Sequence, residues 1–238
     1  MDKDRVVVSR RSRPAKAPLG REGIVAAALD VLAGEGLSGL SLRRVAAALD
    51  TGAASLYVYL ANLDELHALM LDSALAAVRL PATSRGDWRA RLKSVLKLYL
   101  RTLHERPGLA QLAMSTIASG PNSLRIWELL LGLLKEGGVE DGKAAWGVDL
   151  LILYVTAIAA EQSLRSPGGD ELDRVKAALD GVSAREFPLV FAARAALIAG
   201  DDDGGEGRGA WALDVILDGI VAARRPPAKS VRSARSAK

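Results

Sequence analysis

The chain has 238 residues, of which 50% are apolar and 25% are charged. A chain of this length and composition can bury one large core or two small ones. The absence of cysteine excludes disulfides, thiolate metal sites and cysteine nucleophiles. The only two histidines, His67 and His104, lie far apart in the sequence, so we expect no metal and no cofactor.

The apolar segments are too short for a membrane helix. The longest candidate, Leu150 to Ala160, is about half as long as the roughly 18–20 residues that a span requires. The first residues lead into a basic stretch, which does not fit a secretory signal. We therefore expect a soluble, cytoplasmic protein with no membrane partner.

Positive charge is concentrated at the two ends of the chain. Residues 1–21 carry seven Lys and Arg against two Asp, and residues 222–238 carry six and no acid. Because the net charge is +4, the residues between carry about −7. Such ends either contact a polyanion or are simply solvated. Their prolines predict a flexible basic arm over residues 1–20 and a disordered basic tail over residues 224–238.

Alanine and leucine dominate the rest of the chain, and β-branched runs of period two are lacking, which predicts an all-α fold. A first helix ends near Gly34 and Gly36, and Ser41 and Asn62 are candidate N-caps of the second and fourth helices. A short third helix reaches Tyr59. Seven further helices are predicted at about 87–105, 108–119, 122–136, 141–165, 170–181, 184–199 and 207–223.

Residues 41–60, SLRRVAAALDTGAASLYVYL, have the pattern of a helix-turn-helix. The alanines allow two helices to approach closely. Small residues on the second helix let its backbone enter a major groove, where Ser and Tyr hydroxyls can reach phosphates. The periodicity by itself fits a generic helical hairpin as well.

The run LSLRRVAAALDTGAASLYVYLANLDELHALMLD resembles the N-terminal domain of the tetracycline-repressor (TetR) family of transcription regulators. The final helix, residues 211–220, is similar to the last helix of the branch with a tetracycline-repressor-like C-terminal domain. Three positions depart from the family pattern. Asp50 replaces a glycine of the turn, Thr51 replaces a valine, and Leu63 replaces a lysine that resembles a phosphate clamp.

The resemblance implies a three-helix helix-turn-helix DNA-binding domain over residues 21–66, followed by a larger helical bundle over residues 67–223 for ligand binding and dimerisation. It implies DNA contacts from Arg43, Arg44, Thr51, Gly52, Ala53, Ala54, Ser55, Tyr57, Val58 and Tyr59. Arg43 either pairs with guanine or is a solvated surface residue, and the role of Arg44 is equally open. Tyr57 and Tyr59 either divide between phosphate and core or both belong to the core.

The resemblance also implies a ligand cavity enclosed by helices between residues 87 and 165. Its candidate residues are Arg79, Val95, Tyr99, Leu103, Met114, Trp127, Trp146, Tyr154, Ile158 and Glu161. Each apolar or aromatic candidate also fits a place in the core. Arg79 and Glu161 either pair with each other or leave Arg79 to meet an anionic ligand. The histidines that a magnesium–tetracycline ligand needs are absent.

Together these features predict a ligand-responsive transcription regulator, a repressor that a small molecule releases from a palindromic double-stranded DNA operator. A two-fold operator requires a homodimer, for which Val148–Ala160 and Trp211–Val221 are the candidate interface helices, with Ala157, Ala159 and Ala160 allowing close packing. The alternative is a small-molecule-binding helical protein with weak or lost DNA binding. Leu63, in place of the family's lysine, is the feature that supports this alternative. An enzyme is not expected, because no catalytic constellation is evident.

Overall fold

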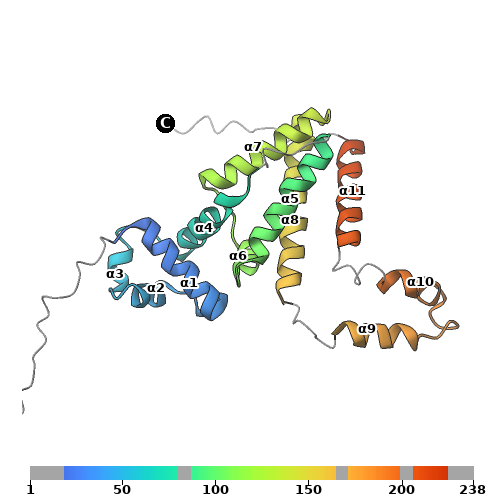
Figure 1. Cartoon of the computed structure of the whole chain (residues 1–238), viewed down its shortest axis with the longest axis horizontal. Coiled ribbons are helices and arrows are strands. Elements are labelled where there is room, and N and C mark those ends of the chain that lie inside the picture. The colour runs from blue at the N-terminus through green and yellow to red at the C-terminus, as the bar shows by residue number, and fades with distance from the viewer. Residues whose placement is uncertain (1–18, 80–86, 165–170, 199–205, 225–238) are drawn as a thin grey trace, which may run out of the picture.

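The computed structural model describes residues 19–79, 87–164, 171–198 and 206–224, and every regular element in these ranges is helical (Figure 1). The predicted all-α fold is confirmed. Most of the predicted arm and tail, the breaks at Pro81 and Gly86, and the glycine-rich run 200–205 lie outside the described residues.

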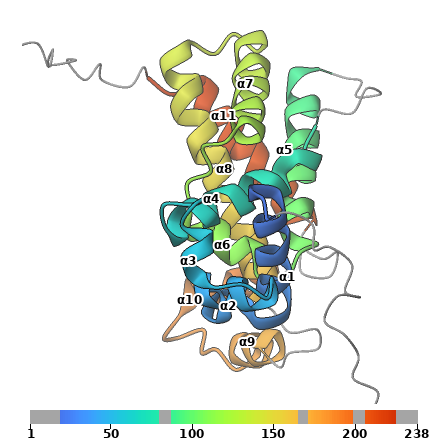
Figure 2. The same cartoon turned by 90° about the vertical axis from the view of Figure 1, so that its left-hand side faces the viewer.

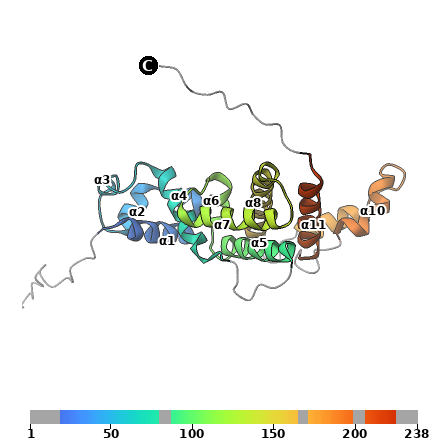
Figure 3. The same cartoon turned by 90° about the horizontal axis from the view of Figure 1, so that it is seen from above.

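The N-terminal part consists of α1 (Arg21–Gly39), α2 (Leu42–Ala48) and α3 (Ala53–Leu56), which lie together at one end of the molecule (Figures 1 and 3). Gly36 interrupts α1 with φ 70° and ψ −179°, where the sequence predicts the end of the first helix. The buried core of this part is formed by apolar residues of all three helices and of α4: Ile24, Ala28, Leu32, Val45, Leu56 and Leu66.

The connection to the second part is α4 (Leu63–Ala74), which continues into a short 3-10 helix, η2 (Leu75–Ala77). The predicted caps of α2 and α4 both form: Ser41 Oγ accepts from the Arg44 amide at 3.2 Å, and Asn62 Oδ1 accepts from the Glu65 amide at 2.8 Å. The C-terminal end of α4 lies against helices of the second part, so α4 belongs to both parts of the molecule (Figure 1).

The second part is built from α5 (Trp88–His104), α6 (Leu109–Ser115), α7 (Pro121–Glu136), α8 (Asp141–Leu164) and α11 (Glu206–Ala222). Helix α8 packs against the other four and is the central helix of the bundle (Figure 2). The helices agree closely with the sequence-based expectation, with one exception that matters for the site. Helix α6 ends at Ser115, not near residue 119, and residues 116–119 have no regular structure.

By length and composition, α8 is apolar enough to cross a membrane, with a mean hydropathy of 1.5 over its most apolar window. This window is 44% buried inside the protein. The buried residues, among them Leu151, Val155 and Ala159, pack in the core, so the apolar character of α8 fits its place at the centre of the bundle.

Helices α9 (Glu171–Asp180) and α10 (Pro188–Ile198) pack on each other and project from the bundle (Figures 1 and 3). No residue of α10 is buried, although the helix is strongly apolar. Leu189 is 83% exposed.

Candidate DNA-binding surface and ligand cavity

The turn between α2 and α3 is closed by a Schellman motif. The amide of Thr51 donates to the carbonyl of Ala46 at 2.9 Å, and the amide of Asp50 donates to the carbonyl of Ala47 at 3.0 Å. Asp50 adopts the left-handed conformation, with φ 51°, which usually favours glycine but which aspartate also tolerates. The departure from the family glycine therefore leaves the turn geometry intact.

The ten predicted DNA-contacting residues lie on α2, on the turn and on α3 with the residues that follow it, at the end of the molecule away from the bundle (Figure 1). Tyr57 and Val58 are 58% and 79% exposed, so their side chains are accessible on this surface. Tyr59 is half-buried and packs against the core. The remaining positions form a small, largely exposed surface: Arg43, Arg44, Gly52 and Ala54 are exposed, and Thr51, Ala53 and Ser55 are half-buried.

The two neighbouring arginines of α2 differ in their partners. Arg44 pairs with Glu35 of α1, with the guanidinium Nε donating to the two carboxylate oxygens at 2.7 and 2.9 Å. This pairing raises the pKa of Arg44. Arg43 is exposed, and within the described ranges it forms no ion pair or hydrogen bond through its side chain. Of the two, Arg43 is therefore the guanidinium available to an incoming base or phosphate.

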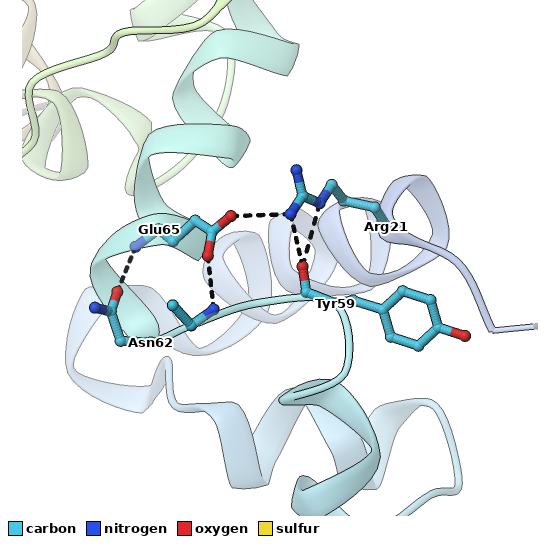
Figure 4. Close-up of polar contacts among 5 residues, drawn as sticks. Arg21, Tyr59, Asn62 and Glu65 are labelled. Carbon is cyan, nitrogen blue, oxygen red and sulfur yellow. Dashed lines mark hydrogen bonds and ion pairs between the residues drawn. The ribbon is translucent and has the colours of Figure 1, made fainter.

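A set of polar contacts fixes the segment that leaves α3 (Figure 4). The Arg21 guanidinium donates to the carbonyl of Tyr59 at 2.8 and 3.2 Å and pairs with Glu65 at 3.0 Å. Glu65 also accepts from the amide of Ala61 at 2.6 Å. Together with the Asn62 cap, these bonds join the start of α1, the exit of α3 and the start of α4. We call this set, Arg21, Tyr59, Ala61, Asn62 and Glu65, the clasp.

Leu63, which stands where the family has a lysine, is the first residue of α4 and packs partly buried against the core. Asp64 and Glu65 follow in the same first turn, where acidic residues stabilise the helix dipole. The N-terminus of α4 thus carries an apolar contact and negative charge in place of a cationic clamp.

A cavity of about 500 Å³ lies in the second part of the molecule. It is enclosed by α4, η2, α5, α6 with its following loop, α7 and α8. Its lining is mostly apolar, and the residues are Leu71, Leu75, Tyr99, Ala113, Met114, Ser115, Thr116, Ile117, Ala118, Ser123, Ile126, Trp127, Leu131, Ala145, Val148, Asp149, Ile152, Leu153 and Thr156. A cavity of this size and character suits a small organic ligand.

Three of the ten predicted ligand residues, Tyr99, Met114 and Trp127, line this cavity. The other seven lie elsewhere. Val95 and Leu103 are fully buried in the core, whereas Arg79, Trp146 and Glu161 are exposed and Tyr154 and Ile158 are half-buried outside the lining. In the part of the chain that the structure describes, no cluster of metal-ligating side chains occurs.

Sequence reasoning missed a buried carboxylate between the two parts. Asp72 of α4 is only 6% exposed. One of its oxygens accepts from the Ser123 amide at 2.8 Å and the Ser123 hydroxyl at 2.9 Å, and the other accepts from the Asn122 side chain at 3.0 Å. Asp72 thus caps the N-terminus of α7. Gly120 is required beside it, because a Cβ there would lie 2.2 Å from the carboxylate carbon.

Residues 80–224 match the model of the tetracyclin repressor-like C-terminal domain. The chain is 36% identical to the HTH-type transcriptional repressor DrrR1 of Streptomyces coeruleorubidus over 154 residues, which cover 64% of this chain and 57% of DrrR1. It is 31% identical to an HTH-type transcriptional regulator of Saccharopolyspora erythraea over 174 residues, which cover 72% of each protein.

Crystal structures of ActR from Streptomyces coelicolor are also similar. The apo form has a TM-score of 0.78 and 36% identity, covering 87% of this chain and 97% of ActR, and the complex of ActR with actinorhodin has the same TM-score. The fold and the exposed helix-turn-helix define a DNA-binding transcription regulator. The chain belongs to the tetracycline-repressor family, as the N-terminal motif and the C-terminal domain both indicate.

Proposed function

We propose that this regulator is a repressor that leaves a palindromic operator when a small molecule fills the cavity. One observation carries the proposal: α4 takes part in both sites. Its first residues belong to the clasp that fixes the exit of α3, and Leu71 and Leu75 near its other end line the cavity. A ligand that displaces these leucines therefore acts on the same helix that positions the DNA-binding surface.

The buried carboxylate gives this coupling a second route. Ser123 lines the cavity and also donates two hydrogen bonds to Asp72. A change in α7 on ligand binding is thus transmitted to α4 through Asp72. To move the protein from 1:99 to 99:1 in favour of the released state, the ligand must prefer that state by about 5.5 kcal/mol.

The proposed dimer interface lies on α8 and α11. Trp146 and Leu150 of α8 and Trp211 and Val215 of α11 are between 45% and 67% exposed, and the two helices pack side by side. Ala157 is exposed on α8, but Ala159 and Ala160 are buried within the protomer and are therefore not available to a second copy. Pairing of these faces with a second copy would bury these exposed apolar side chains.

Residues 21–66 are our proposed DNA-binding domain, and residues 67–223 our proposed ligand-binding and dimerisation domain, with the basic residues of 1–20 and 224–238 adding charge toward DNA. We place the protein in the cytoplasm and assign it regulation without catalysis. ActR, which is similar over nearly its whole length, has been crystallised with actinorhodin and with (S)-DNPA. These two molecules are the first ligands to test.

The test is a gel shift on DNA that flanks the gene of this protein, with each ligand added over a concentration series. Trp127 lines the cavity, so its fluorescence reports occupancy in the same samples. Because the two equilibria are linked, occupancy and release from DNA must follow one concentration range. Saturated fluorescence with undiminished DNA binding would refute ligand-induced release. Failure to bind any flanking DNA would favour the alternative, a ligand-binding protein that has lost tight DNA binding.

A further inference from the structure

The polar groups of the cavity are unevenly distributed between its mouth and its inner end. At the mouth, Ile117 and Leu153 are 83% and 55% exposed, and Met114 and Trp127 are partly exposed as well. At the inner end, Tyr99 of α5 and Thr156 of α8 are only 5% and 4% exposed. These two hydroxyl groups therefore belong to the buried part of the lining and not to its exposed part.

The two hydroxyls do not satisfy each other. Tyr99 Oη and Thr156 Oγ1 lie 3.3 Å apart and share one hydrogen bond, in which either oxygen can be the donor. Each hydroxyl carries one hydrogen, so whichever donates, the other keeps an O–H without an acceptor among the described residues. Burial raises the pKa of Tyr99, so its phenol stays protonated and remains able to donate.

We propose that Tyr99 and Thr156 form a hydrogen-bonding subsite that takes a carbonyl or another neutral acceptor oxygen of a flat ligand. The inference rests on the proposed function of the cavity and goes beyond it by assigning the ligand class and the residues that select it. An acceptor oxygen at this place uses the spare O–H, whereas a hydrocarbon edge leaves it buried and unpaired, which is unfavourable.

The rest of the lining fits the same ligand class. Trp127 and Tyr99 offer aromatic surfaces, and Met114 offers a polarisable one, to a flat ring system. The only charged side chain among the lining residues is Asp149, which is exposed and repels an anion. Arg79, the cation that the sequence placed at the site, lies outside the lining.

The experiment compares two probes that differ by one oxygen. 9-Fluorenone has a tricyclic aromatic frame with a single ketone, and fluorene has the same frame without it. Binding of each to the full-length protein is measured by equilibrium dialysis. We expect the wild type to prefer fluorenone over fluorene by roughly fivefold, the effect of about one net hydrogen bond.

The decisive variant is the double substitution Tyr99→Phe with Thr156→Val. It removes both oxygens and keeps both shapes, and replacing both partners of a buried hydrogen bond by apolar groups leaves stability nearly unchanged. We expect its preference for fluorenone to fall to about one. Tyr154→Phe is the matched control, because Tyr154 lies outside the lining, and it should keep the wild-type preference. Ala145→Trp, which fills the exposed rim of the cavity, should reduce binding of both probes.

A preference for fluorenone that survives in the double variant overturns the subsite, and so does a wild type that binds neither probe or binds both equally. Undiminished binding of both probes to Ala145→Trp also overturns the subsite, because the probes would then bind outside the cavity. Operator affinity of the same preparations is measured separately by gel shift. If the fluorenone preference contradicts the subsite but operator binding and ligand-induced release are intact, the proposed function is unaffected. If the protein shows the fluorenone preference but does not bind an operator, the proposed function is wrong and the subsite is unaffected.

Discussion

The DNA-binding surface and the ligand cavity are built by opposite means. The surface consists of residues between 43 and 59, most of which are exposed. The hydrogen bonds and ion pair of the clasp fix the segment that leaves α3. The cavity uses residues spread from 71 to 156, drawn from α4 through α8, and many of them are also part of the core. A change on the surface can therefore alter binding and leave the fold intact, whereas a change in the cavity alters both unless the shape of the side chain is kept.

Substitution of Asp72, which fastens α4 to α7 beside the cavity, should have the largest effect on stability. Asp72→Ala leaves the amide and hydroxyl of Ser123 and the side chain of Asn122 without their acceptor in a buried place. Each such loss is costly, so we expect the free energy of unfolding to fall by about 2–3 kcal/mol. Urea denaturation of the two proteins measures the difference.

Asp72→Asn is the control, because it keeps one acceptor oxygen and the volume of the side chain. It should destabilise the protein less than Asp72→Ala. If both variants unfold at the wild-type urea concentration, Asp72 does not fasten α4 to α7, and the coupling through Ser123 must be abandoned.

Arg43 tests the other side of the contrast. Arg43→Ala should leave stability nearly unchanged, because the side chain is exposed and forms no hydrogen bond or ion pair within the described residues. It should weaken operator binding by about 1–3 kcal/mol if the guanidinium pairs with a base, and weaken binding to random DNA much less. Arg44→Ala is the matched control on the same helix. Equal losses on both DNAs would restrict Arg43 to a phosphate contact.

Substitution of the turn residue Asp50, in the helix-turn-helix, should have a smaller effect on stability. Asp50→Val places a β-branched residue at φ 51°, which should lower the free energy of unfolding by about 1–2 kcal/mol. Asp50→Gly and Asp50→Asn, both compatible with the left-handed conformation, should remain close to the wild type. Thermal or urea unfolding of the three variants measures these differences in the free energy of unfolding. A valine variant as stable as the glycine variant would mean that the Schellman motif is not maintained in solution.

The smallest effect is expected from the Arg44–Glu35 pair, which is exposed and largely screened by solvent. Glu35→Gln removes the carboxylate that holds Arg44 and leaves the guanidinium available to a phosphate. The slope of log affinity against log salt should then steepen by about 0.9, with a slight gain in affinity for any DNA. An unchanged slope would show that Arg44 does not reach DNA even when it is released.

Local signals in the sequence predicted the first region well. Ser41 and Asn62 were identifiable as caps, because a cap depends on a side chain and an amide only three residues away. The clasp is different, since Arg21 contacts a carbonyl 38 residues further along the chain. From the sequence, Arg21 belongs only to the basic N-terminal end of the chain, and the folded arrangement directs it to Tyr59 and Glu65.

The cavity could not be predicted in the same way. Val95, Tyr99 and Leu103 share one face of α5 by their spacing, yet only Tyr99 reaches the cavity. On α8, Trp146 is exposed, while Ala145, Asp149 and Thr156 on a neighbouring face form the lining. Which part of an apolar helix face meets another helix and which meets a void depends on the packing of all its neighbours. The early end of α6 at Ser115, which brings residues 116–118 to the cavity, has the same origin.

The clasp also fixes where the basic N-terminal segment joins the helix-turn-helix. By tying Arg21 to the exit of α3, it fixes the point from which residues 1–20 depart at the edge of the DNA-binding surface. A fully extended segment of 20 residues spans about 70 Å, or about two turns of B-form DNA. If residues 1–20 contact phosphates, the DNA footprint should extend beyond the half-sites, and that extension would carry no information about the operator sequence.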